Sequence, residues 1–122
     1  MSSMLLWLGV GALGGIGSIA RLLVDAVVSE HAPGEFPFGT LLVNLSGSVV
    51  LGVLVGIALR GDGYLLAGTA VIGSYTTFST WLLESQRLAE EGRSWAFAAN
   101  VVLSLVLGVC AVAAGQLIGG GQ

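Results

Sequence analysis

The residues best suited to chemistry in this sequence are neutral hydrogen-bond donors in the middle of apolar stretches. Four hydroxyl side chains fall within residues 76–80, with Phe78 among them and Trp81 directly after; they are Thr76, Thr77, Ser79 and Thr80. Hydroxyl and amide groups donate hydrogen bonds without a formal charge, and the edge of an aromatic ring carries the positive side of its quadrupole. Such donors can replace the water around a small anion and still release it.

Two further stretches repeat polar or small residues at steps of four. The first contains Thr40, Asn44, Ser48, Gly52 and Gly56. The second contains Asn100, Ser104, Gly108 and Gln116, with Val112 interrupting the series. Residues four apart share one face of a helix, and a polar face is costly against lipid. Both faces are therefore expected to meet protein or water, where they can line a path. For the second stretch, hydrogen bonds that only hold helices together are an equal alternative.

The composition indicates that a membrane positions these residues. The chain has 122 residues, of which 55% are hydrophobic and only 9% charged, whereas a soluble domain has about 25% charged residues. Four charge-free stretches each reach the roughly 20 residues that a membrane-spanning helix needs. We predict an all-α integral membrane protein, a single unit over residues 1–122, with both termini on one side and helices over residues 4–28, 39–59, 64–86 and 94–118.

The same composition argues against several classes of protein. The four basic residues form no cluster that could follow a phosphate backbone, so nucleic acid is not an expected partner. No nucleophile, base and orienting residue fall into a pattern, so no enzyme is expected. Arg60 lies on one side of the membrane and Arg87 and Arg93 on the other, which Arg21 would make three. This bias in positive charge is weak, so insertion in both orientations is a hypothesis. Arg21 and Asp25, four residues apart, are expected to pair.

Glycine and the hydroxyl cluster together predict how the helices are shaped. Three glycine pairs spaced by four give small faces to three helices, which favours close packing: Gly11 and Gly15, Gly52 and Gly56, and Gly115 and Gly119. In the third span, hydroxyl side chains beside Gly73 compete for backbone hydrogen bonds and predict a break near mid-membrane. A broken helix frees carbonyl oxygens, which can coordinate a cation.

These residues resemble the CrcB/Fluc family of fluoride channels over the whole chain. The motifs that carry the resemblance are Gly14-Gly15 to Arg21, Gly39-Thr40-Leu41 through Asn44 to Gly47, and Thr76-Thr77-Phe78-Ser79-Thr80. The resemblance implies an antiparallel, dual-topology dimer in the cell (inner) membrane, crossing it several times, with two fluoride pores and a central structural sodium ion. A homodimer is expected, and a heterodimer with a related subunit is the alternative.

The resemblance also implies roles for individual residues. Gly73 and Thr76 would offer backbone carbonyls to sodium, and Asn44 would donate to fluoride. The pore residues would be Asn44, Phe78, Trp81, Ser79, Thr80, Thr40, Ser104, Asn100, Arg21 and Glu84. The sequence departs from the family pattern where Trp81 replaces a second pore phenylalanine, Asn100 a tyrosine, Ser74 a glycine and Leu22 an aromatic residue.

The expected function is passive, selective efflux of fluoride from the cytoplasm, which confers fluoride resistance. One alternative is a small multidrug transporter, but that chemistry needs a carboxylate within the first span, and residues 4–20 contain none. A second alternative is a non-transporting membrane scaffold. It would need only the glycine faces and would leave Asn44 and residues 76–80 without a role.

Overall fold

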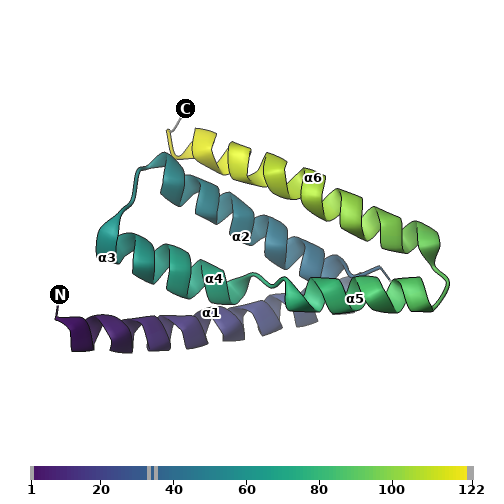
Figure 1. Ribbon diagram of the computed structural model, residues 1–122, viewed down its shortest axis with the longest axis horizontal. Helices are drawn as coiled ribbons and strands as arrows, with labels where there is room; N and C mark the ends of the chain where they lie inside the picture. Colours follow the sequence, from purple (N-terminus) through teal and green to yellow (C-terminus); the bar gives the residue numbers. More distant parts are fainter. Residues whose placement is uncertain (1, 33, 35, 121–122) are drawn as a thin grey trace.

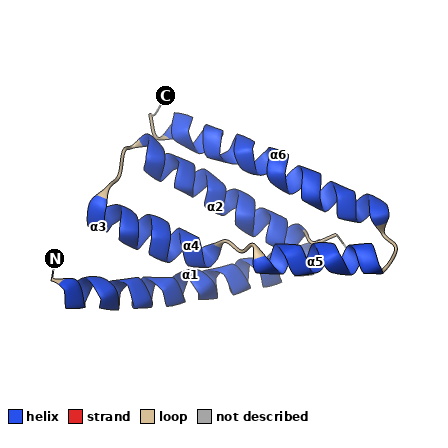
Figure 2. Cartoon of the chain, viewed as in Figure 1, coloured by secondary structure: helices blue, strands red, loops and turns tan. Residues whose placement is uncertain are grey.

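The computed structural model describes residues 2–32, 34 and 36–120, and every regular element in these ranges is helical (Figures 1 and 2). The elements in order are α1 (Ser3–His31), α2 (Phe38–Gly56), α3 (Gly61–Tyr64), the π-helix η1 (Leu65–Ile72), α4 (Gly73–Tyr75), α5 (Ser79–Glu90) and α6 (Ser94–Ile118). The run from α3 to α5 forms the third of four passes along the long axis. The predicted all-α membrane fold with a broken third span is confirmed.

The predicted helix bounds agree best for the last helix, α6. α6 has the predicted bounds, whereas α1 continues to His31 and α2 ends at Gly56 rather than near residue 59. The early end of α2 has a local cause, because Ala58 adopts a φ of 59°. The amide of Leu59 then donates to the oxygen of Leu54, and that of Ala58 to the oxygen of Val55. These two hydrogen bonds form a Schellman motif, which terminates a helix.

Successive passes run antiparallel, and both termini lie at the same end of the molecule (Figure 1). α2 is central, packing against α6 on one side and α1 on another, while α1 also packs along η1 and α4. Large apolar side chains cover the outside; in the most apolar window of α1 only 6% of residues are buried. Three helices, α1, α2 and α6, are long and apolar enough to span a bilayer. The exterior is therefore suited to lipid, as expected for a multi-pass cell membrane protein.

Glycines bring α2 and α6 into backbone contact. A Cβ on Gly52 or Gly56 would overlap backbone atoms of α6, and a Cβ on Gly115 or Gly119 would overlap backbone atoms of α2. We call these four residues the glycine seam. Two of the three predicted glycine pairs thus pack as expected, because small residues let helices approach without a hydrophobic driving force.

The third glycine pair, on α1, does not pack inside the subunit, so its close packing in an assembly stays a prediction. A Cβ on Gly11 or Gly15 would meet no other atom within 4 Å. The close approach of α1 occurs instead at Gly17, where a Cβ would overlap the hydroxyl of Ser74 and the backbone oxygen of Val71. Gly17 is two residues from Gly15 on a helix of about 3.6 residues per turn, so the two lie on nearly opposite faces.

Candidate pore at the helix break

The third pass loses its helical hydrogen bonding between α4 and α5, as the loop in Figure 2 shows. Thr76 is extended, with φ −79° and ψ 162°. Its hydroxyl donates to the backbone oxygen of Ile72 at 3.0 Å, and the hydroxyl of Thr77 accepts from the amide of Thr80 at 3.2 Å. The first hydroxyl bonds back to the last residue of η1, and the second caps the start of α5. Local side-chain hydrogen bonds of this kind are the predicted cause of the break.

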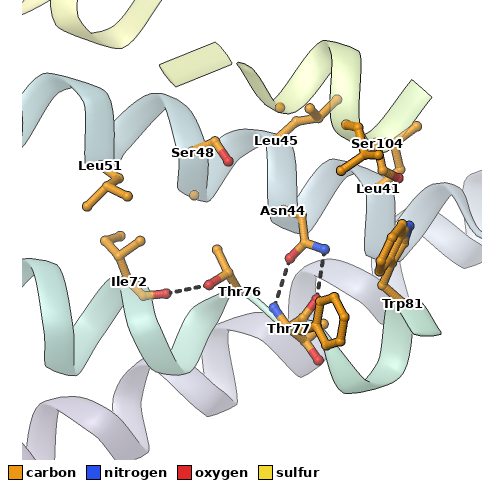
Figure 3. A pocket seen from close by; sticks show the side chains of 14 residues that line it. Leu41, Asn44, Leu45, Ser48, Leu51, Ile72, Thr76, Thr77, Trp81 and Ser104 are labelled. Carbon is orange, nitrogen blue, oxygen red and sulfur yellow. Dashed lines mark hydrogen bonds between the residues drawn. The ribbon is translucent and has the colours of Figure 1, made fainter. Parts of the chain in front are cut away.

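Asn44 of α2 pairs with the backbone of the break through both ends of its amide (Figure 3). Its Nδ2 donates to the oxygen of Thr77 at 2.9 Å, and its Oδ1 accepts from the amide of Thr77 at 2.8 Å. The side chain thus makes two hydrogen bonds to the backbone of Thr77, which lies between the helices α4 and α5. One hydrogen on Nδ2 stays available for another acceptor, because an amide nitrogen donates twice.

Two contacts that the sequence gave no reason to expect hold the other side of the break. The hydroxyls of Tyr75 and Ser46 are hydrogen-bonded at 2.9 Å. Gly47 leaves room for the break, because a Cβ there would overlap the methyl group of Thr76. Gly47 belongs to the motif that carries the family resemblance, but its close contact with Thr76 depends on tertiary structure.

A cavity of about 320 Å³ opens where the break faces α2 and α6 (Figure 3). Its lining residues are Leu41, Asn44, Leu45, Gly47, Ser48, Leu51, Ile72, Thr76, Thr77, Phe78, Trp81, Ser104, Leu105 and Gly108. None of these fourteen described residues is charged. The rings of Phe78 and Trp81 lie 5.4 Å apart at 51°, and the buried hydroxyl oxygen of Ser104 has no hydrogen-bond partner among the described residues. The lining therefore combines apolar walls with a few neutral donors.

A second, much smaller space lies on the α1 side of the break. Arg21, Thr40 and Thr80 line it together with Leu22, Asp25, Val43 and Thr77, around a volume of about 10 Å³. The predicted ion pair of Arg21 and Asp25 is wrong, since no ion pair joins them in the described chain. Asp25 instead accepts from Ser29 at 3.3 Å, and its carboxylate lies where a Cβ on Gly39 would be. The N-terminal end of α2 thus draws Asp25 away from Arg21.

Comparison with known proteins accounts for nearly all of the chain. Residues 8–116 match the family model described as CrcB-like protein, Camphor Resistance (CrcB). This chain belongs to the CrcB family. Among curated relatives, it is 53% identical to "Fluoride-specific ion channel FluC 2" of Mycolicibacterium paratuberculosis, over 95% of each chain. It is 51% identical to the protein of that name in Mycobacterium tuberculosis, over 93% of this chain and 90% of the relative. It is 38% identical to "Fluoride-specific ion channel FluC 1" of Symbiobacterium thermophilum, over 95% and 98%.

The remaining pore candidates of this CrcB chain lie outside both spaces. Ser79 is exposed at the start of α5, and Glu84 is half-buried with one carboxylate oxygen unpartnered in the described chain. Asn100 is fully buried and donates to Ser85 at 2.8 Å. Four of the ten candidates thus line the cavity, three line the smaller space and three line neither. Ser85, buried between α5 and α6, had no role in the sequence-based expectations.

The break of this CrcB chain also frees the two carbonyl groups expected to meet sodium. The amide of Thr77, which would reach Gly73 in a continuous helix, donates to Asn44 instead. The amide of Thr80, which would reach Thr76, donates to the hydroxyl of Thr77. In the described residues neither carbonyl oxygen accepts another hydrogen bond. Free carbonyl oxygens at an unwound helix are suitable ligands for a sodium ion, so these residues fit the group.

Proposed function

We propose that this chain forms a fluoride-selective channel that lets fluoride leave the cytoplasm passively. The observation that carries the proposal is the cavity at the helix break, which is lined by neutral donors and contains no charged side chain. The curated relatives, which are named fluoride-specific ion channels, support the same conclusion. Efflux of this kind protects a cell, because hydrogen fluoride crosses membranes as a neutral acid and dissociates inside.

The lining indicates how fluoride would lose its water. The free hydrogen of the Asn44 amide and the hydroxyls of Ser48 and Ser104 would donate to the ion in turn. Phe78 and Trp81 would add the positive edges of their rings. Because none of these groups carries a full charge, the ion would be bound weakly enough to move on. The absence of a carboxylate from this lining argues against coupling to protons.

The surface of the subunit supports assembly into an antiparallel, dual-topology homodimer. Phe78 lines the cavity and yet is 68% exposed, so a second chain could complete the wall beside it. The open glycine face at Gly11 and Gly15 would allow a second backbone to approach closely. Relatives carry the names FluC 1 and FluC 2, which keeps a heterodimer with a related subunit as the alternative.

A structural sodium ion at the centre of the dimer is part of the proposal. Gly73 and Thr76 of each subunit would contribute their free carbonyl oxygens. The ion would neutralise these inward-facing dipoles and so hold the two breaks together. Three or more His, Cys, Asp or Glu side chains do not come together anywhere in the described chain, so the backbone is the favoured source of ligands.

The test of the channel proposal is fluoride efflux from liposomes that contain only this purified chain. The liposomes would be loaded with potassium fluoride and treated with valinomycin, and a fluoride electrode would record the release. We expect rapid fluoride release with little chloride release. Release no faster than from protein-free liposomes, by folded protein, would contradict the proposal for this chain alone. Restoration of flux by a co-expressed related subunit would then identify a heterodimer.

A further inference from the structure

A set of hydrogen bonds joins α5 to α6 behind the wall of the cavity. The Asn100 Nδ2 donates to the Ser85 hydroxyl at 2.8 Å, and that hydroxyl donates to the backbone oxygen of Trp81 at 2.8 Å. The indole Nε1 of Trp81 donates in return to the backbone oxygen of Asn100, at a long 3.5 Å. We call Trp81, Ser85 and Asn100 the α5–α6 clamp. The three bonds form a closed ring, because it begins and ends at Asn100.

Two of the three clamp side chains, those of Asn100 and Ser85, are almost fully buried. Asn100 is 0% and Ser85 3% exposed, and Leu88, one turn further along α5, is 1% exposed. Buried polar groups are costly unless they are hydrogen-bonded, and replacing both partners by apolar groups of similar shape can be nearly neutral. An apolar pair could therefore pack these helices equally well. The polar pair instead fixes the orientation of Trp81, to which both residues are hydrogen-bonded.

Trp81 is held at two points. The Ser85 hydroxyl fixes its backbone oxygen, and the backbone of Asn100 accepts from its ring nitrogen. The indole N–H therefore points toward α6, while the ring itself lines the cavity 5.4 Å from Phe78. A free indole N–H in the cavity would be a stronger donor than a ring edge and would serve any halide. With this N–H directed toward Asn100, Trp81 presents the carbon atoms of its ring to the cavity.

We propose that Asn100 and Ser85 are positioning residues, which keep the indole N–H of Trp81 out of the cavity and thereby set the preference of the channel for fluoride over chloride. This inference rests on the proposed function. It assigns Asn100 a place behind the wall rather than in the ion path. It also gives Ser85, which lines neither space at the break, a part in selectivity.

The test uses the full chain in liposomes, with Trp7→Phe and Trp95→Phe so that Trp81 is the only tryptophan left. Trp7 and Trp95 are 64% and 86% exposed, so their replacement should be tolerated. Asn100→Ala removes one hydrogen bond of the clamp and should lower the fluoride-to-chloride permeability ratio about fivefold, the factor expected for one lost hydrogen bond. Ser85→Ala removes two and should lower the ratio at least as much. The fluorescence anisotropy of Trp81 should fall in both. Ser85→Thr, which keeps the hydroxyl, and Val102→Ala, on the exposed face of α6, should change neither measurement.

The outcomes separate this inference from the channel proposal. A parent chain that conducts no fluoride overturns the proposed function and the selectivity role with it. A conducting parent whose permeability ratio is unchanged in both alanine variants overturns this inference alone. A lower permeability ratio without a fall in Trp81 anisotropy would show that Asn100 and Ser85 do not act by holding Trp81. This result would also overturn the inference. In a Trp81→Phe background, which lacks the indole N–H, Asn100→Ala should no longer lower the ratio, and a full effect there would contradict the clamp.

Discussion

α2 meets α6 at the glycine seam and the third pass at the helix break, and these two contacts are built by opposite means. At the seam, Gly52 and Gly115 let two backbones touch, so that an added Cβ would overlap a backbone oxygen. At the break, the side chains of Asn44 and Tyr75 reach out to an irregular third pass. Lipid provides no hydrophobic force between helices, so close packing and directed hydrogen bonds are the remaining ways to hold them. The glycine seam leaves no space between the helices, whereas the helix break leaves a cavity lined by donors.

The seam should be the least tolerant part of the molecule. In Gly115→Leu the new side chain would meet the backbone of α2, including the oxygen of Val49, which cannot rotate away. We expect loss of the folded protein, at a cost above the roughly 3 kcal/mol of ordinary overpacking. The measurement is the monodisperse fraction after size-exclusion chromatography in detergent. Gly108→Ala on the same helix is the control, since a Cβ there would meet no atom within 4 Å. Equal monodisperse fractions from both variants would contradict the close backbone packing at the glycine seam.

At the break, the largest effect should come from Phe78. In Phe78→Ile the aromatic edge is lost while an apolar side chain remains, so the chain should assemble but lose fluoride flux. The exposed position of Phe78 in the subunit makes misfolding an unsuitable explanation for the loss. Fluoride efflux from liposomes, normalised to folded protein, is the measurement. Phe97→Ile on α6, away from the cavity lining, is the matched control and should conduct normally. Normal flux in Phe78→Ile would show that the Phe78 ring is not needed for fluoride conduction.

Variants of Asn44 can separate its two proposed roles, which are hydrogen bonding to the backbone of the break and donating a hydrogen bond to fluoride. Asn44→Asp keeps an acceptor for the amide of Thr77 but loses the donor to its oxygen and adds a charge that repels fluoride. Flux should fall by at least about tenfold, the upper end for one hydrogen bond. Asn44→Ala removes both hydrogen bonds without adding charge. If Asn44→Ala conducts normally while Asn44→Asp does not, repulsion dominates; equal losses indicate that pairing with Thr77 dominates.

The sequence predicted the features that arise within one segment. The bounds of α6 followed from a charge-free run after Arg93, and the break followed from hydroxyl groups concentrated within residues 76–80. Such signals act over a few residues, where propensity and local hydrogen bonds decide the structure. The helix break by itself predicts only free carbonyl groups. The expectation that these groups bind sodium came from the family resemblance.

The sequence did not predict which faces meet. Gly11 and Gly15 have the same spacing as the glycines of the seam, yet they face outward from the subunit. Spacing identifies a small face but not its partner, because the partner depends on how the whole bundle packs. For the same reason the sequence did not reveal that Asn44 pairs with a backbone 33 residues away. The early end of α2 escaped prediction because a non-glycine residue, Ala58, takes the left-handed conformation there.

The smallest expected effect concerns Tyr75, and it tests whether every polar contact at the break serves the ion. Tyr75→Phe removes the hydroxyl that bonds to Ser46 and leaves the ring beside Gly47. Interhelical hydrogen bonds in membranes average about 0.6 kcal/mol, so thermal stability in detergent should fall slightly and fluoride flux should stay within about twofold. Ser46→Ala removes this shared bond and also the bond from the Ser46 hydroxyl to the backbone oxygen of Val43. The double variant should therefore be no worse than Ser46→Ala alone. A flux loss beyond about tenfold in Tyr75→Phe would place this hydroxyl in the ion path, since one structural bond of this size cannot account for it.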